Sequence, residues 1–121
     1  MKQLALVFIG GGFGSVLRYL LSNWLNTSET SFPIGTFASN IIGCFLVGLI
    51  LGAAAKNITF SPNAVLLLAT GFCGGFTTFS TFALESNLFL KNGDFLIFAL
   101  YTIASFAVGL AMVFLGLWLV K

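Results

Sequence analysis

Histidine is absent from this sequence of 121 residues, and acidic residues are scarce, with only three Asp and Glu in all. Nucleophilic catalysis that relies on histidine, most metal-dependent hydrolysis and most phosphoryl transfer need side chains that the chain lacks. We therefore expect that the protein is not an enzyme. Its five Lys and Arg residues are scattered and form no basic run that would neutralise phosphates, so we expect no nucleic acid partner.

Charge and cysteine are both rare. Charged residues make up 7% of the chain and hydrophobic residues 59%, whereas about a quarter of the residues in a soluble domain are charged. This composition excludes a water-soluble fold. The two cysteines, Cys44 and Cys73, lie in apolar stretches at a spacing that fits no metal site, and we interpret them as small buried apolar residues.

Long apolar runs are abundant instead. Each exceeds the roughly 20 residues that a helix needs to cross a bilayer, and they cover residues 4–24, 32–55, 64–90 and 95–120. The segments between them are short and contain turn-forming and charged residues. We predict an all-α integral membrane protein in which a single domain, residues 1–121, contains four transmembrane helices.

The charges that set orientation in a membrane are nearly balanced. With four spans, both termini and the second connection lie on one side of the membrane. That side has three lysines, and the other side has one. These are Lys2, Lys56 and Lys121 against Lys91, which has Glu29 and Asp94 on its side. Because this bias is weak, the chain can insert in both orientations. Two opposite copies can then pair as an antiparallel, dual-topology homodimer.

Glycine is concentrated in the apolar runs, which hold 13 of the 14 glycines. Several recur four residues apart, a spacing that lets helix backbones approach closely in lipid. The pairs are Gly10/Gly14, Gly48/Gly52 and Gly71/Gly75. We predict close helix packing; generic packing without a pore is the alternative. Four helices enclose little space, so a conduit would need an oligomer.

The third run contains an unusual segment at residues 70–82, where a glycine pair precedes four hydroxyl side chains. Both features weaken a helix, and we predict that this span is broken in the middle. Backbone groups freed in lipid must be buried in protein, line a wet cavity or bind an ion. The carbonyls of residues 74–77 are therefore candidate cation ligands, and a kinked but fully packed helix is the alternative.

A helix after the break would present two different faces. Thr77, Thr81 and Glu85 would share one face, while Phe79 and Phe82 would lie together on another. A glutamate inside a membrane is expensive enough to suggest a function. The weakly positive edges of the two rings can face an anion, although ordinary core packing is the alternative.

Few other polar side chains lie within the runs. Asn40, Tyr101 and Ser105 are neutral hydrogen-bond donors, and such donors suit an anion that sheds water, binds and leaves again. The alternative is that Asn40 and Ser105 simply join helices. Arg18, in the second half of the first run, either serves the same pathway or extends to the membrane interface.

Three segments resemble the signature sequences of the Fluc/CrcB family of microbial fluoride channels. They read GGGFGSVLRY (10–19), GTFASNIIG (35–43) and GFCGGFTTFSTF (71–82). The resemblance implies a dual-topology homodimer in the inner (plasma) membrane that exports fluoride passively through two pores at the subunit interface. It also implies a structural sodium ion on the two-fold axis, bound by main-chain carbonyls of Gly74 and Thr77.

The resemblance further implies the roles of individual side chains. Asn40 would be the amide donor in the pore, and Phe79 and Phe82 would border the fluoride path. The remaining pathway positions would be Arg18, Ser80, Thr81, Glu85, Tyr101 and Ser105. The family sometimes has a second serine one turn after Ser105, and here that residue is Gly109.

A proton-coupled exporter is the alternative from another class. The small multidrug resistance family has a similar length, four spans and antiparallel dimers. Those transporters use a carboxylate in the first helix, where this sequence offers only Arg18.

Overall fold

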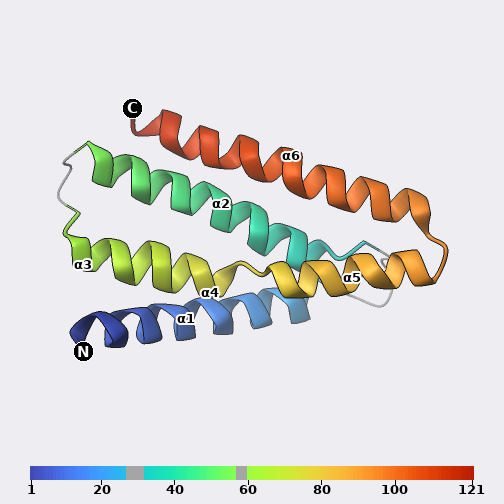
Figure 1. Cartoon of the computed structure of the whole chain (residues 1–121), viewed down its shortest axis with the longest axis horizontal. Helices are drawn as coiled ribbons and strands as arrows, with labels where there is room; N and C mark the ends of the chain where they lie inside the picture. The colour runs from blue at the N-terminus through green and yellow to red at the C-terminus, as the bar shows by residue number, and fades with distance from the viewer. Residues whose placement is uncertain (27–31, 57–59) are drawn as a thin grey trace.

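A computed structural model describes residues 1–26, 32–56 and 60–121, which form four rods running alternately up and down (Figure 1). The first, second and fourth rods are α1 (Lys2–Leu25), α2 (Ile34–Ala55) and α6 (Phe95–Leu119). The third rod, Pro62–Lys91, is composite. All four are long and apolar enough to cross a membrane, and their ends agree with the predicted runs to within two residues. Glu29 lies outside the described residues.

The third rod changes its winding along its length. It begins with α3 (Pro62–Val65), continues as the π-helix η1 (Leu66–Cys73) and then forms the short α4 (Gly74–Phe76). Thr77 and Thr78 are extended, with ψ of 158° and 124°. Helical structure resumes in α5 (Phe79–Lys91). The predicted break in the third span is therefore present.

Both termini lie at one end of the molecule, together with the end of α2 and the start of α3 (Figure 1). The opposite end carries the tight turn from α5 to α6. Gly93 in that turn has a φ of +78°, which an L side chain rarely adopts, and this explains the one glycine outside the apolar runs. The arrangement agrees with the expectation that the chain ends share one side.

Glycines bring α1 into backbone contact with the third rod. A Cβ at Gly10 would lie 2.2 Å from the carbonyl oxygen of Leu67, and one at Gly14 would lie 2.2 Å from that of Phe72. A Cβ at Gly75, on the facing helix, would lie 2.3 Å from the carbonyl of Gly11. No side chain larger than hydrogen fits at these positions without a shift of the backbone.

A second glycine contact joins α2 to α6. A Cβ at Gly48 would lie 2.5 Å from the carbonyl oxygen of Val113, and one at Gly116 would lie 2.5 Å from that of Phe45. The close helix packing predicted from glycine spacing is therefore confirmed in both helix pairs. The rods are drawn together by van der Waals contact, as in other membrane helices.

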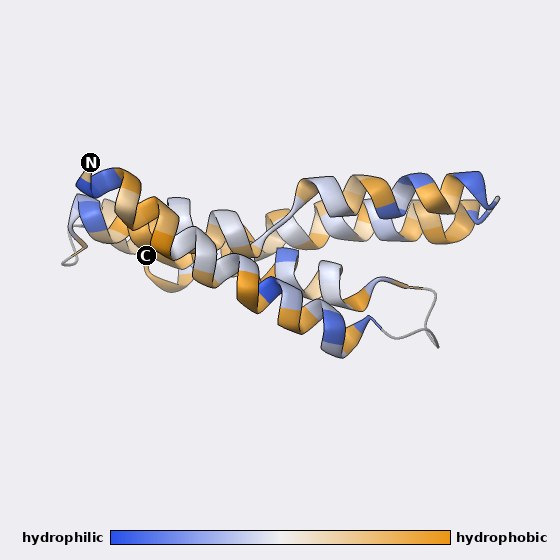
Figure 2. Ribbon diagram, turned by 90° about the horizontal axis from the view of Figure 1, so that it is seen from below, coloured by the Kyte–Doolittle hydropathy of each residue, from blue (hydrophilic) through white to orange (hydrophobic). Residues whose placement is uncertain are grey.

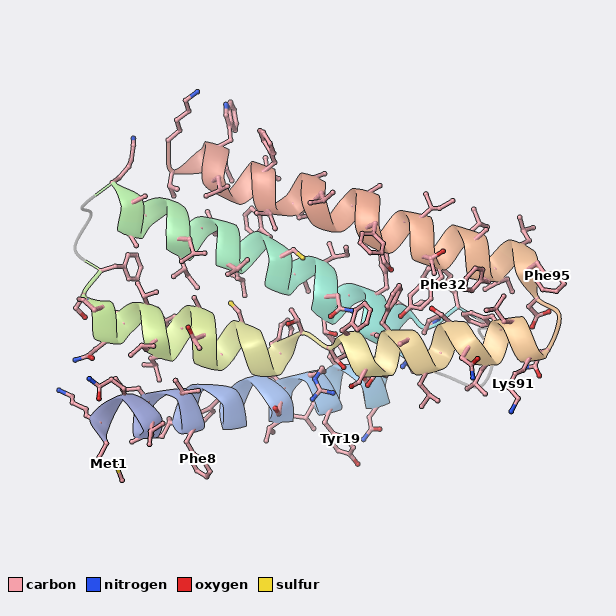
Figure 3. The ribbon with its side chains drawn as sticks, viewed as in Figure 1. Met1, Phe8, Tyr19, Phe32, Lys91 and Phe95 are labelled. Carbon is pink, nitrogen blue, oxygen red and sulfur yellow. The ribbon has the colours of Figure 1, made fainter. Side chains whose placement is uncertain are left out.

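Most large apolar side chains point outward, and the interior holds small residues together with a few aromatic rings such as Tyr101. Phe8 is 82% exposed, while Thr36 and Ser39 are at most 1% exposed. Apolar residues extend along the rods, and polar ones gather near their ends (Figure 2). Labelled residues such as Phe8, Tyr19 and Phe95 extend away from the bundle (Figure 3). This distribution suits a hydrocarbon solvent.

Candidate functional site

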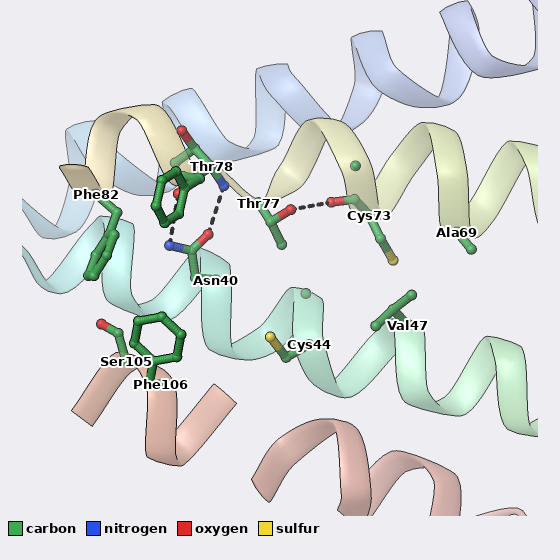
Figure 4. Close-up of a pocket in the computed structure, with 13 residues that line it drawn as sticks. Asn40, Cys44, Val47, Ala69, Cys73, Thr77, Thr78, Phe82, Ser105 and Phe106 are labelled. Atoms are coloured by element: carbon green, nitrogen blue, oxygen red, sulfur yellow. Dashed lines mark hydrogen bonds between the residues drawn. The ribbon is translucent and has the colours of Figure 1, made fainter. Parts of the chain in front are cut away.

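A groove of about 410 Å³ runs beside the break in the third rod (Figure 4). Its walls come from α2, η1, α4, α5 and α6. The lining residues that carry polar or aromatic groups are Asn40, Cys44, Cys73, Thr77, Thr78, Phe79, Phe82, Ser105 and Phe106. The structure therefore brings Asn40, the aromatic pair and Ser105 together, as the sequence suggested.

The helix breaks at Thr77 and Thr78, one residue after the glycine pair. Gly74 and Gly75 remain helical, so within the predicted segment 70–82 the break lies at the threonines and not at the glycines. Gly75 serves packing, because it is pressed against Gly11, whereas a Cβ at Gly74 would meet no other atom of the described chain within 4 Å. Threonine ends the helix because its hydroxyl group bonds to nearby backbone.

The two threonines satisfy backbone groups on either side of the break. The Thr77 hydroxyl donates to the carbonyl of Cys73 at 2.9 Å. The Thr78 hydroxyl caps α5 by accepting the N–H of Thr81 at 3.2 Å. Since Thr77 is extended, the expectation that it shares a helical face with Thr81 and Glu85 was wrong.

Asn40 in α2 forms hydrogen bonds to the break through both the oxygen and the nitrogen of its side-chain amide. Its Oδ1 accepts the N–H of Thr78 at 2.7 Å, and its Nδ2 donates to the carbonyl of the same residue at 3.1 Å (Figure 4). These bonds replace helical partners that the extended backbone lacks. The second N–H of the Asn40 amide is left for the groove, so the joining role and the donor role are compatible.

The carbonyls around the break fall into two groups. Those of Cys73, Gly75 and Thr78 accept hydrogen bonds, which for Gly75 come from Arg18 Nε at 3.0 Å and Ser15 Oγ at 3.4 Å. Within the described part of the chain, no hydrogen bond reaches the carbonyl of Gly74 or Thr77. Gly74 and Thr77 line the groove, so their free oxygens suit a hard cation.

Arg18 therefore points into the helix bundle, and it does not extend to the membrane interface. Ser15, one turn earlier in α1, shares its acceptor. Sequence reasoning missed Ser15, although its spacing of three residues from Arg18 places both on one helix face.

Phe79 and Phe82 are neighbours, as expected, with ring centroids 5.7 Å apart. Their surroundings differ: Phe79 is 73% exposed, whereas Phe82 is 7% exposed and packs on Tyr101 with centroids 5.0 Å apart. Phe82 is thus a fixed wall of the groove. Phe79 projects from the surface of the chain.

Glu85 is held by two hydroxyl groups from other helices. Thr36 in α2 donates to Oε2 at 3.0 Å, and Tyr101 in α6 donates to Oε1 at 2.9 Å. Tyr101 is fully buried, and its hydroxyl points toward Glu85 and not into the groove. Thr36 lies one turn before Asn40 in α2, and nothing in the sequence indicated that it would meet Glu85.

Of the remaining hydroxyls, that of Ser105 lies in the groove wall and those of Ser80 and Thr81 lie at the start of α5. Ser105 Oγ is buried and has no hydrogen-bond partner among the described residues, so it is a free donor in the groove wall. Ser80 is exposed, and its hydroxyl lies 3.3 Å from that of Thr78. Thr81 also meets the Thr78 hydroxyl, at 3.2 Å. The three form a hydroxyl cluster at the start of α5.

The cysteines agree only in part with their interpretation as buried residues. Cys73 is buried and Cys44 is half-buried, and both are free thiols. Both also line the groove, which the sequence did not indicate. Their weakly polar thiol groups make this part of the groove wall less polar than the part that Asn40 lines.

Known proteins resemble this chain over its full length. A family model described as "CrcB-like protein, Camphor Resistance (CrcB)" matches residues 5–117. A protein of Gloeothece citriformis named fluoride-specific ion channel FluC is 49% identical over 100% of this chain and 98% of its own. Proteins of the same name from Chlorobaculum tepidum (48% identical, 100% and 96% covered) and Leptospira interrogans (42%, 99% and 95%) are similar to it as well. The matches agree with the family resemblance of the three glycine-rich segments, and the chain belongs to the CrcB family.

Proposed function

We propose that this chain is a channel, and not an enzyme, through which fluoride leaves the cell passively across the inner membrane. The observation that carries the proposal is the groove at the break, where the Asn40 amide and the unpartnered Ser105 hydroxyl lie beside the rings of Phe79 and Phe82. Relatives named as fluoride-specific ion channels support the choice of ion.

Neutral donors fit a small, strongly hydrated anion. Fluoride must exchange water for other hydrogen bonds, and the amide and hydroxyl groups supply them without the trapping that a full positive charge would cause. The positive ring edges of Phe79 and Phe82 border the same space. Chloride is larger and gains less from these donors, so the narrow passage excludes it.

The groove is completed by a second copy of the chain in the opposite orientation. On one protomer the groove is open, and Phe79 and Phe106 at its side are 73% and 65% exposed. Gly74 is exposed and helical, and no contact with the described residues requires glycine there. Close approach of a partner backbone explains both features. A two-fold dimer then forms two pores at the interface.

A sodium ion binds on the two-fold axis between the copies. The free carbonyls of Gly74 and Thr77 supply two oxygens from each copy, and main-chain oxygens are hard ligands that suit such a cation. The ion would stabilise backbone that the break leaves without partners. The hydroxyls of Ser80 and Thr81 and the Glu85–Tyr101 pair continue the polar path along α5.

Ion flux from liposomes tests the function. Purified protein is reconstituted into liposomes loaded with fluoride or with chloride, and efflux is recorded with ion-selective electrodes at equal pH on both sides. We expect rapid fluoride efflux and chloride efflux no faster than from protein-free liposomes. Equal passage of both ions overturns the selectivity, and fluoride efflux that requires an imposed pH gradient indicates the coupled exporter instead.

Gly74→Ala tests the dimer and the sodium ion together. The added methyl group meets no atom of the described residues within 4 Å, so the protomer should fold, but it should obstruct the partner and reduce both dimer formation and flux. Gly12→Ala is a matched control, because a Cβ there also meets no atom within 4 Å. Cross-linking and sedimentation in detergent report the dimer. Unchanged dimer and flux in Gly74→Ala would contradict this interface.

A further inference from the structure

Arg18 is a charged residue within a membrane-spanning helix, and its side chain is used inside the protomer. Its Nε donates to the carbonyl of Gly75 at 3.0 Å. Arg18 is not part of the groove lining, whereas Gly74, Thr77 and Thr78 are. The guanidinium group therefore approaches the break from the α1 side, behind the groove.

Gly75 is held against α1 by its backbone as well. A Cβ at Gly75 would lie 2.3 Å from the carbonyl of Gly11, and Ser15 Oγ approaches the same Gly75 carbonyl at 3.4 Å. In a continuous helix this carbonyl would accept the N–H four residues later, but the extended Thr77 and Thr78 remove that partner. Arg18 supplies the missing donor, and a charged donor makes the stronger bond.

Asn40 and Arg18 thus hold the break from opposite sides. Asn40 fixes the Thr78 peptide from α2, and Arg18 fixes the Gly75 carbonyl from α1. The carbonyls of Gly74 and Thr77, to which no described residue donates a hydrogen bond, each directly precede an anchored residue, Gly75 or Thr78. Their positions follow from how firmly the neighbouring peptides are held.

We propose that Arg18 is a positioning residue, which anchors the Gly75 peptide to α1 and so places the Gly74 and Thr77 carbonyls for a cation, and that it does not meet the permeating anion. The proposal rests on the proposed function for the identity of the ions. Its structural part, the anchoring of the break by Arg18, is independent of that function.

Amide hydrogen exchange of the protein in micelles tests the anchor. Arg18→Met removes every donor but keeps a long apolar side chain. We expect exchange at residues 74–78 to accelerate about tenfold, as for the loss of one charge-assisted hydrogen bond. Lys2→Met, which removes a charge from the same helix far from the break, should leave that exchange unchanged. Ser15→Ala, which loses only the longer contact, should have a smaller effect. Unchanged exchange in Arg18→Met overturns the anchor.

Flux measurements separate positioning from attraction of the anion. The chain is reconstituted, depleted of sodium, and titrated with sodium and with fluoride. We expect Arg18→Met to raise the sodium concentration for half-maximal flux about tenfold, with the fluoride concentration for half-maximal flux unchanged. Arg18→Gln, which is neutral but keeps N–H donors, should restore part of the sodium response.

A different pattern would assign Arg18 to the anion path. If Arg18→Gln and Arg18→Met raise the half-maximal fluoride concentration equally while the sodium response stays as in the unmodified chain, the charge attracts fluoride and the positioning role is wrong. If the unmodified chain passes no fluoride, the proposed function is overturned. Amide hydrogen exchange would still decide whether Arg18 anchors the break.

Discussion

Asn40 and Thr78 are joined by two hydrogen bonds of 2.7 and 3.1 Å, in which one carboxamide occupies both the N–H and the carbonyl of a single residue. An amide is the side chain suited to this task, because it carries a donor and an acceptor of fixed geometry. The contact ties α2 to the point where the third span loses its helical bonds. It also aims the amide at the groove.

Asn40→Asp should suppress fluoride flux by about a factor of ten or more, because a negative charge in a poorly screened groove repels the anion. Aspartate still accepts the Thr78 N–H but cannot donate to its carbonyl. Liposome efflux provides the measurement. Asn92→Asp, at an exposed position in the turn after α5, adds the same charge away from the groove and should conduct normally. Full flux in Asn40→Asp would remove Asn40 from the path.

Phe79→Ile and Phe82→Ile should both reduce fluoride flux while the dimer still forms, since each removes a ring edge from the groove. Their stabilities should differ. Phe82 loses its contact with Tyr101, at a cost of about 1–2 kcal/mol, whereas Phe79 is 73% exposed on the protomer. Efflux and thermal unfolding in micelles measure the two effects. Phe114→Ile, at a ring that is 77% exposed outside the groove, is the control.

Normal flux in both variants would show that the rings are packing residues only. Normal flux in Phe79→Ile alone would restrict the aromatic role to Phe82.

Gly14→Ala should destabilise the fold by about 1–3 kcal/mol, because its methyl group would lie 2.2 Å from the carbonyl of Phe72 and force α1 away from the third rod. Gly12→Ala, two residues earlier on the open face, should be neutral or stabilise the helix by about 0.5–1 kcal/mol. Unfolding in mixed micelles compares the two. Equal stability of both variants would contradict the backbone contact between α1 and η1.

Tyr101→Phe removes the hydroxyl that donates to Glu85 at 2.9 Å. We expect a loss of about 1–2 kcal/mol in unfolding free energy, since the carboxyl group is left with one donor fewer in a buried setting. A double-mutant cycle with Glu85→Met, which removes the acceptor, should give a coupling energy of similar size. Thr36→Val, which removes the donor to the other carboxyl oxygen, serves as a parallel case. Strict additivity of Tyr101→Phe and Glu85→Met would mean that the bond contributes nothing to stability.

The four spans were predictable because hydrophobic length decides them. A run such as residues 95–120 has one stable structure in lipid, a helix, and the observed α6 (Phe95–Leu119) follows it closely. The glycine contacts were predictable for the same reason. Gly10 and Gly14 have no purpose in an isolated helix, and small residues four positions apart mark helix contacts in membranes.

The position of the break was less predictable, because both glycine and threonine weaken a helix. Tertiary contacts decide which of these residues lies at the break. Gly75 is pressed against Gly11, while Asn40 provides substitute hydrogen-bond partners for Thr78. Helix propensity alone contains neither contact. The sequence therefore indicates the segment within a few residues but not the peptide at which the helix ends.

Long-range polar pairs could not be predicted at all. Arg18 and Gly75 are 57 residues apart in the chain, and Thr36 and Glu85 are 49 apart. A donor on one helix and an acceptor on another follow no common periodicity. The sequence therefore shows which polar residues are present but not which of them form a hydrogen bond. The resemblance to the channel family named Arg18 and Glu85 but not what they bind within the chain.

The π-helical winding of Leu66–Cys73 has a consequence for how the third span tolerates insertions and deletions. A π turn contains more residues than an α turn, so this segment carries surplus length without displacing the helix on either side. Removing one residue there would allow ordinary α winding while keeping Pro62 and Gly74 near their present angular positions. The same deletion within Gly74–Phe76, where winding is already tight, would rotate the two threonines away from Asn40.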